Sequence, residues 1–252
     1  MPPSPLTLHA LVCVALACSA PAMAQAPPPA TPPELTAWTV TAGAGLALTS
    51  GNTDTSTVNA SYEVVYDPPA QYLIRSDGLM IRGKNEGELS ADRLGLNVRS
   101  ELSLNERAYV FGQNHFLRDR FKSIDYLLAP AAGVGYTMIK TPDTTMAVDL
   151  GLGGVWEKNA NVRVSASGSL TIGESLSHTL TATTSLTQSF SGLWKTTDFG
   201  DSLHVFSLGV SATMSTRTQL KIEVLDTYKN EPPLATVQKN DVAILIAIVY
   251  KM

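Results

Sequence analysis

Apolar and small polar residues alternate along almost the whole chain from residue 38 onward. In the first segment, Trp38–Thr49, apolar side chains occupy every second position, and the positions between them hold mostly Thr and Gly. Alternation with a period of two predicts β-strands with one apolar and one polar face. Eleven further segments with this pattern lie near residues 55–67, 71–82, 90–102, 107–117, 125–138, 144–156, 162–173, 179–190, 203–215, 218–228 and 241–252.

The pattern is irregular at three places. The alternation loses its phase at Gly78 and is unclear around Tyr109, and a β-bulge would explain either irregularity. Pro130 falls inside a predicted strand. Because proline lacks the amide hydrogen that a sheet ladder needs, we expect Pro130 at a bulge or a strand end.

The aromatic residues favour a membrane barrel over a soluble β-sandwich or a lipocalin. Aliphatic residues fill the middle of most predicted strands, whereas aromatic residues lie toward two rims: Trp38, Tyr66, Tyr72, Tyr136 and Tyr250 at one, Trp156, Phe190 and Trp194 at the other. Aromatic girdles around an aliphatic band are typical of outer-membrane barrels, as is an even number of strands. We therefore predict an all-β fold, a single antiparallel transmembrane β-barrel of about 12 strands over residues 38–252.

The predicted connections agree with that fold. Every second one is compact (DPPA, SLNE, KTPD, GESLSH, STR), and several of the others are longer (LRDRFKSI, SGLWKTTDFGD, KNEPPLATVQK). Short periplasmic turns and longer outer loops give this rhythm. The longest apolar run after the leader, Val242–Tyr250, is too short for a membrane helix and fits one strand.

The first 24 residues have the outline of a secretory signal peptide. An apolar core, LVCVALA, precedes Ala22-Met23-Ala24, although no Lys or Arg marks its start. Cleavage there leaves a proline-rich tail, residues 25–37, which we expect to be disordered in the periplasm. Lipidation at Cys18 is the rival interpretation, but Ala15-Leu16-Ala17 is a poor lipobox.

Export and alternating strands together predict the outer membrane of a Gram-negative cell. The expected partners are the lipid bilayer and the barrel assembly machinery. The chain has 18 basic and 22 acidic residues and a net charge of −4, which argues against a nucleic-acid partner. Both cysteines lie in the leader, so the mature chain has no disulfide and no thiolate metal ligand.

Charged residues on the polar strand faces are the candidate functional residues. They would cost up to about 2–4 kcal/mol each in lipid at mid-depth, so we expect them to face the lumen. They are Glu63, Arg75, Asp77, Arg93, Asn97, Arg99, Glu101, Asp149 and Arg163. They line either a hydrated path or ligand cavity, or a closed interior in which opposite charges satisfy one another. Because Arg75 and Asp77, and likewise Arg99 and Glu101, share a strand face, we predict a mixed-sign constriction with weak ion selectivity.

The sequence offers little for catalysis. His115, His178 and His204 remain after removal of the leader, and none presents a defensible Ser–His–Asn or Ser–His–Asp arrangement. Ser177-His178 falls in a predicted periplasmic turn. No histidine pair has metal-ligand spacing and no Gly-rich phosphate loop occurs, so we expect no cofactor or metal. The leading hypothesis is a non-enzymatic envelope protein, a narrow pore or structural barrel; the alternative is an outer-membrane hydrolase of lipase or protease type.

Short motifs in order along the domain resemble those of a known family. Ser50-Gly51-Asn52-Thr53-Asp54 follows the first strand, and further support comes from Arg118-Asp119-Arg120-Phe121, Gly133-Val134-Gly135-Tyr136, Asp149-Leu150-Gly151-Leu152-Gly153 and Val249-Tyr250-Lys251. The chain resembles the YdiY-like salt-induced outer-membrane proteins, a family of unknown molecular function. The resemblance implies a link to salt or osmotic response and no catalytic residues. Such proteins typically finish in an aromatic residue, whereas this sequence finishes in Met252.

Overall fold

The computed structural model describes residues 37–50, 55–85, 88–120, 122–160 and 162–252, which belong to one compact unit. Among these residues, the side chains of 47–50, 55–57, 84, 85 and 88–91 are outside the description. The predicted signal peptide, residues 25–36 of the predicted tail and the turn residues Gly51–Asp54 also lie outside the described residues.

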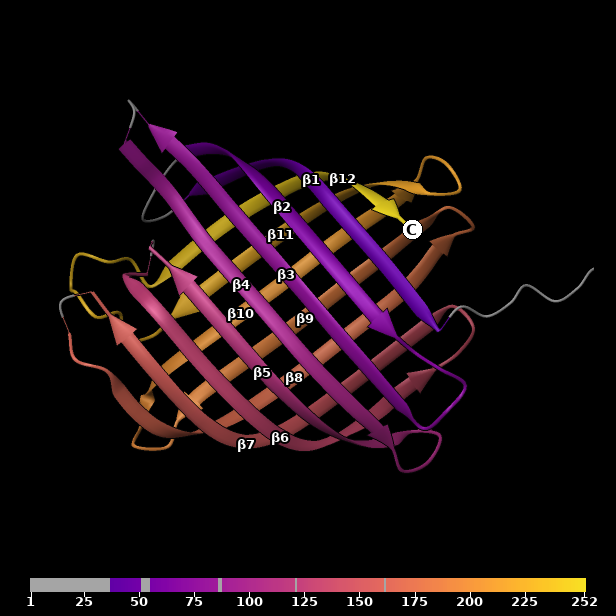
Figure 1. Cartoon of the computed structure of the whole chain (residues 1–252), viewed down its shortest axis with the longest axis horizontal. Coiled ribbons are helices and arrows are strands. Elements are labelled where there is room, and N and C mark those ends of the chain that lie inside the picture. The colour runs from indigo at the N-terminus through magenta and orange to yellow at the C-terminus, as the bar shows by residue number, and fades with distance from the viewer. Residues whose placement is uncertain (1–36, 51–54, 86–87, 121, 161) are drawn as a thin grey trace, which may run out of the picture. The chain divides into compact units, whose positions relative to one another are not determined.

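Twelve strands form one closed antiparallel barrel (Figure 1). They are β1 Trp38–Ser50, β2 Thr55–Tyr66, β3 Tyr72–Asn85, β4 Glu88–Ser103, β5 Ala108–Asp119, β6 Ile124–Lys140, β7 Thr144–Asn159, β8 Ser165–Thr181, β9 Thr184–Lys195, β10 Asp198–Thr213, β11 Thr218–Lys229 and β12 Asn240–Lys251. Each strand pairs with its neighbours in sequence, and β1 pairs with β12. The predicted all-β barrel of twelve strands is confirmed.

The closing pair joins the two ends of the domain. Ala44 lies opposite Ile248 and Leu46 opposite Ile246, while β12 pairs on its other side with β11. Figure 1 shows the indigo β1 beside the yellow β12. Because the sheet returns to its first strand, its backbone donors and acceptors have partners all round and no strand edge is left open.

The barrel has two ends, which we name by their connections. The turn end holds the five connections that follow the even-numbered strands up to β10, together with both termini of the barrel, where the Met252 amide donates to the Val40 carbonyl over 2.9 Å. The loop end holds the other connections; the longest of those described, residues 230–239, joins β11 to β12. The corresponding halves of the lumen are the turn half and the loop half.

Several predicted connections are in fact strand. The predicted turn at residues 173–178 lies within β8, where Ser177 and His178 pair with Thr145 and Thr144 of β7, and the true turn follows Thr181. The predicted outer loop at residues 191–201 is almost entirely strand, with only residues 196 and 197 outside β9 and β10. The last residues of β8 continue the sheet beside β7 at the turn end. The last residues of β9 and the first of β10 continue it at the loop end, where Leu193 and Leu203 pack inside the barrel.

The irregular places have different causes from those predicted. The β2–β3 register runs unbroken through Gly78, and the phase changes because Leu79 and Ile81 pack inside the barrel. The register of β5 against β6 is likewise unbroken at Pro130, which lies opposite Asn114; the shifts in β6 lie nearer its two ends. The expectation that Pro130 marks a bulge or strand end is therefore wrong. Around Tyr109 the pattern is unclear because aromatic side chains of β5 face inward.

The outer face is apolar and exposed. Ile244, Ile246 and Ile248 on β12 are 40–49% exposed, whereas the intervening Leu245 is 4% exposed. At the turn end Trp38 contacts Tyr66 with 4.4 Å between ring centroids, and Tyr66 contacts Tyr72 at 5.9 Å. Within the described residues, no helix has the length and apolar character required to cross a membrane.

Candidate functional site in the barrel lumen

Apolar side chains fill part of the loop half of the lumen. Leu117 on β5, Leu127 on β6, Val155 on β7, Leu193 on β9 and Leu203 on β10 belong to one cluster whose members are at most 7% exposed. These residues come from strands on different sides of that half. A porin lumen of 16 strands is wide enough to stay open, whereas 12 strands enclose a space that side chains can cross.

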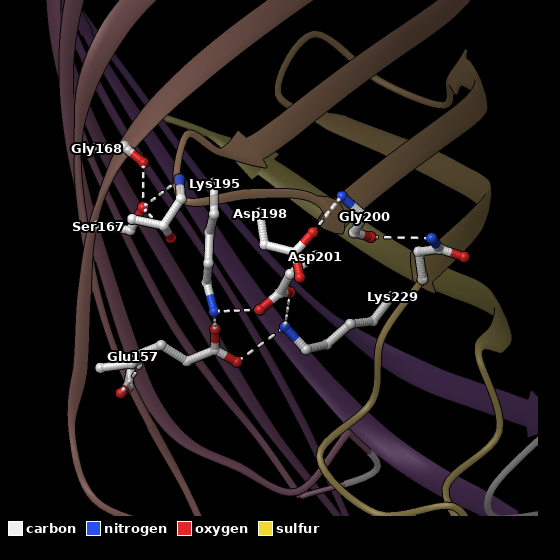
Figure 2. Close-up of polar contacts among 11 residues, drawn as sticks. Glu157, Ser167, Gly168, Lys195, Asp198, Gly200, Asp201 and Lys229 are labelled. Carbon is white, nitrogen blue, oxygen red and sulfur yellow. Dashed lines mark hydrogen bonds and ion pairs between the residues drawn. The ribbon is translucent and has the colours of Figure 1, made fainter.

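Four charged side chains meet beside this apolar cluster, and Figure 2 shows them converging. We call Glu157 of β7, Lys195 of β9, Asp201 of β10 and Lys229 of β11 the ion-pair network. Nζ of Lys229 lies 2.9 Å from Glu157 and 3.1 Å from Asp201. Nζ of Lys195 lies 2.6 Å from Glu157 and also contacts Asp201. Each ammonium therefore lies between two carboxylates, and the network is neutral.

The ion-pair network is largely buried, and its most exposed member is Asp201 at 21%. The side chains of Glu157 and Lys229 are 0% and 2% exposed, and that of Lys195 is 10% exposed. Removing charges from water is costly, and mutual attraction offsets the cost only where geometry is good and each charge is paired. Because two carboxylates and two ammoniums share four contacts, the group is compact and electrically balanced. Such a group fixes the positions of four strands relative to one another.

Two further sets of contacts cross the loop half. Nη1 of Arg93 on β4 donates to Asp119 over 2.9 Å and to the hydroxyl of Thr227 on β11 over 2.7 Å. Lys122, in the β5–β6 connection, lies 2.9 Å from Asp241 of β12 and donates to the backbone carbonyls of residues 238 and 239. The latter contact ties two connections of the loop end together. With the ion-pair network, these contacts narrow the loop half from several sides.

The turn half has a separate charged cluster centred on Arg99. Its guanidinium contacts Glu101 at 2.6 Å and Asp149 of β7 at 2.9 Å, and it donates to Gln113 over 2.8 Å. The guanidinium carbon also lies 3.9 Å from the centroid of the Phe111 ring. This cluster contains both signs of charge, but it is less buried, with Arg99 17% exposed.

Glycines on the inner face make room for the aromatic side chains of β5. A Cβ atom at Gly135 would lie 2.1 Å from the Tyr109 ring, and one at Gly151 would lie 3.0 Å from the Phe111 ring. The lumen is open beside Gly95 on the inner face of β4, where an added Cβ would have no atom within 4 Å. The glycine-containing motifs of β6 and β7 therefore shape the turn half.

The structure places most of the predicted lumen residues on the inner face, with two differences in detail. Arg75 lies 3.5 Å from Glu63 of β2 and does not pair with Asp77, which instead accepts a hydrogen bond from Asn97 over 2.7 Å. The prediction for Arg163 is wrong: it lies in the connection before β8 and is exposed. Its segment was predicted as strand, but β8 begins only at Ser165.

Sequence reasoning missed the ion-pair network. Glu157 and Lys229 each lie one residue beyond the predicted end of their strand, and Lys195 and Asp201 were assigned to an outer loop. The available signal was the period of two, because Lys195 continues the inner face that carries Leu193, and Asp201 the face that carries Leu203.

The three histidines do not come together. His115 contacts Asn97 inside the barrel. His178 belongs to β8 and is therefore not in a turn, and its Nδ1 lies 2.8 Å from the hydroxyl of Thr144 on β7. Nε2 of His204 lies 3.0 Å from the Ser202 hydroxyl on the outer face of β10, a Ser–His contact that sequence reasoning missed. Among the described residues, no group of three or more His, Cys, Asp or Glu side chains is arranged to hold a metal ion.

Comparison with known proteins agrees with this architecture. The profile of a family described as "Protein of unknown function, DUF481" matches residues 42–252. The NanC porin is similar in structure with a TM-score of 0.55 and 10% identity, over 86% of this chain and 100% of that chain. An outer membrane channel from Pseudomonas putida F1 is similar with a TM-score of 0.50 and 12% identity, over 86% and 96% of the respective chains. No curated protein sequence matches.

Proposed function

The chain belongs to the family described as "Protein of unknown function, DUF481", and from that premise we propose that it is an outer-membrane channel with a narrow lumen, held shut in its loop half by ion pairs. Export through a leader cleaved after Ala24, a disordered tail over residues 25–37 and insertion by the barrel assembly machinery are part of the proposal. So is an orientation with the turn end toward the periplasm, which follows from the short connections there.

The outer face supports the membrane location. Large apolar side chains are exposed around the barrel, including Leu150 and Leu152 on β7 at 50% and 66% and Val134 on β6 at 58%. A water-soluble protein rarely exposes so continuous an apolar surface. The cost of that exposure is removed if lipid chains cover it, and the aromatic residues at the turn end then lie at the membrane interface.

One observation carries the proposal of a narrow, closed lumen: Lys229 of β11 contacts Glu157 of β7, four strands away along the wall. Such a contact is made through the lumen, so the space at that level is occupied by protein. The turn half, with its mixed-sign Arg99 cluster, is a vestibule that leads past the open space at Gly95 to this block. A passage with both signs of charge at its wall gives weak selectivity between cations and anions.

Two experiments test the proposal. Outer-membrane fractionation and heat-modifiable migration on a gel should identify a folded outer-membrane barrel, and a soluble periplasmic product would refute that location. Planar-bilayer recordings of the purified barrel in a salt gradient should then show small conductance, or none, and reversal potentials near zero. Large porin-like conductance or strong selectivity would refute the narrow mixed-sign lumen.

The resemblance to salt-induced outer-membrane proteins adds a physiological setting, a response to salt or osmotic stress. The proposal is tested by comparing expression of the chain and growth of a deletion strain in low and high salt. Unchanged expression and growth would remove the salt link and leave the channel proposal standing.

The Ser202–His204 contact favours the alternative, an outer-membrane hydrolase. Such a site also needs an accessible nucleophile and a group that orients the histidine. Ser202 is only 5% exposed, and in the described part of the chain His204 is otherwise bordered by the rings of Phe190, Trp194 and Tyr228. We therefore assign His204 to the aromatic belt and propose no enzymatic activity. Lipase or protease activity lost in both Ser202→Ala and His204→Ala would reverse this assignment.

A further inference from the structure

The outer rim of the loop end differs from one side of the barrel to the other. Over β9–β11 it is aromatic, with Trp194 and Tyr228 both against the ring of His204. Over β3–β5 it is basic. There Arg82 of β3 and Arg118 of β5 face outward on either side of β4, and Arg120 follows directly after β5. We call these three residues the arginine cluster.

Among the side chains that the structure describes, Asp92 of β4 holds two members of the arginine cluster. Asp92 of β4 lies opposite Arg82 in the β3–β4 register, 3.1 Å from Nη2 of Arg118 and 3.6 Å from Nε of Arg120. Its side chain is 15% exposed, whereas those of Arg118 and Arg120 are 44% and 60% exposed. The carboxylate is therefore covered by guanidinium groups that reach past it to the surface. The three arginines and Asp92 together carry a net charge of +2.

The depth of the cluster matches a lipid headgroup layer. Arg82 and Tyr72 both face outward on β3, ten residues apart. Ten residues span about 33 Å along a strand, which a tilt of about 40° reduces to about 25 Å along the membrane normal. That is the height of the apolar band of an outer-membrane barrel. Since Tyr72 lies in the turn-end aromatic rim, Arg82 lies at the opposite interface, above the apolar side chains of β3–β5.

We infer that the arginine cluster binds the phosphate groups of lipopolysaccharide in the outer leaflet. A guanidinium presents paired N–H donors that match phosphate oxygens, and it remains charged at any physiological pH. The guanidinium groups of Arg118 and Arg120 each use one nitrogen on Asp92 and remain accessible. In the outer leaflet the phosphates of lipid A lie at headgroup depth, directly beside this rim. The inference rests on the proposed outer-membrane location and orientation, and it is independent of conductance.

Binding to the folded mature barrel in neutral detergent tests this inference. The probes are bisphosphorylated lipid A and the same lipid A with both phosphates removed, measured by microscale thermophoresis. The wild-type barrel should bind the phosphorylated lipid more tightly, and raising NaCl from about 0.05 to about 0.5 M should weaken that binding. Arg118→Gln/Arg120→Gln should bind the phosphorylated lipid about 25-fold more weakly, because each arginine near a membrane surface contributes about fivefold to affinity.

The control is Arg163→Gln, which removes an exposed arginine at the loop end outside the cluster and should leave affinity unchanged. Heat-modifiable migration establishes that each variant is folded. If the double Gln variant does not fold, the inference is still tested by the affinities of the wild-type barrel for the two lipids and by the salt dependence of its binding. Equal affinity for the two lipids, or equal affinity of wild type and the folded double variant, would overturn the inference. A barrel that binds lipid A in this way but conducts freely would refute only the closed lumen.

Discussion

The guanidinium of Arg93 and the hydroxyl of Thr227 meet across the lumen, with 2.7 Å between Nη1 and Oγ1. Arg93 belongs to β4 and Thr227 to β11, and the shorter way round the wall runs through β3, β2, β1 and β12. Two strands so far apart touch only where side chains cross the interior. The contact therefore locates protein in the loop half of the lumen, independently of the ion-pair network.

We expect Thr227→Val to lower the free energy of unfolding by about 1.5–3 kcal/mol, because it removes a hydrogen bond to a charged, buried donor while keeping the shape of the side chain. Urea unfolding of the barrel in vesicles, followed by tryptophan fluorescence, measures the change. Thr145→Val, at an exposed position of β7, is the matched control and should have little effect. Equal small losses in both variants would show that the cross-lumen contact contributes no stability.

Glu157→Gln should destabilise the barrel by about 3–5 kcal/mol, because it leaves two buried ammonium groups with one carboxylate. The same unfolding assay applies. Glu63→Gln removes a carboxylate that is 46% exposed and ion-paired with Arg75, and it should cost at most about 1 kcal/mol. A similar loss of unfolding free energy in the two variants would contradict the view that the charges of the ion-pair network are buried and depend on one another.

Gly135→Ala should cost about 1–3 kcal/mol, because the added methyl group would lie 2.1 Å from the Tyr109 ring and force that ring off the wall. Gly95→Ala is the control, since its methyl group would point into open space. Thermal unfolding of the two variants side by side measures the difference. If Gly135→Ala and Gly95→Ala lowered the thermal stability equally, Gly135 would not be the position that makes room for the Tyr109 ring.

Mass spectrometry of the exported protein should find Gln25 at the amino terminus, because Ala22-Met23-Ala24 is the small-residue site of the predicted leader. An Ala24→Leu variant should accumulate as precursor, since the peptidase requires a small residue there. A mature chain that begins at a diacylated Cys18 would contradict this prediction and make the protein a lipoprotein.

The strand count and the outer face could be predicted from the sequence because every strand must present apolar side chains to the lipid at every second position. The alternation from Trp38 to Leu48, or from Val242 to Tyr250, reports only that one face is apolar. It holds through the membrane-spanning segment and weakens beyond it. That is why the predicted strand ends fell short in β8 and β9, whose additional residues pair outside the strongly alternating stretch.

The period of two predicted which residues face the lumen, but it did not always predict which of them pair with one another. Arg99 and Glu101 do pair within β4, as their spacing predicted, whereas Arg75 pairs across strands with Glu63. Contacts between distant strands, such as Lys229 with Glu157, depend on the curvature of the closed barrel. Nothing in local sequence reports that curvature, so the network that narrows the lumen could not be predicted.

The most direct test of the closed lumen is single-channel recording from the wild-type barrel and from Glu157→Ala/Lys229→Ala. The double substitution removes one charge of each sign, shortens two side chains that cross the lumen, and leaves Lys195 and Asp201 paired. Glu63→Ala/Arg75→Ala, which removes a half-exposed ion pair from the inner wall of β2 and β3, is the matched control. We expect the wild type and the control to conduct little, and Glu157→Ala/Lys229→Ala to conduct several-fold more. Large conductance in the wild type, or no increase in Glu157→Ala/Lys229→Ala, would contradict an ion-pair network that holds the channel shut.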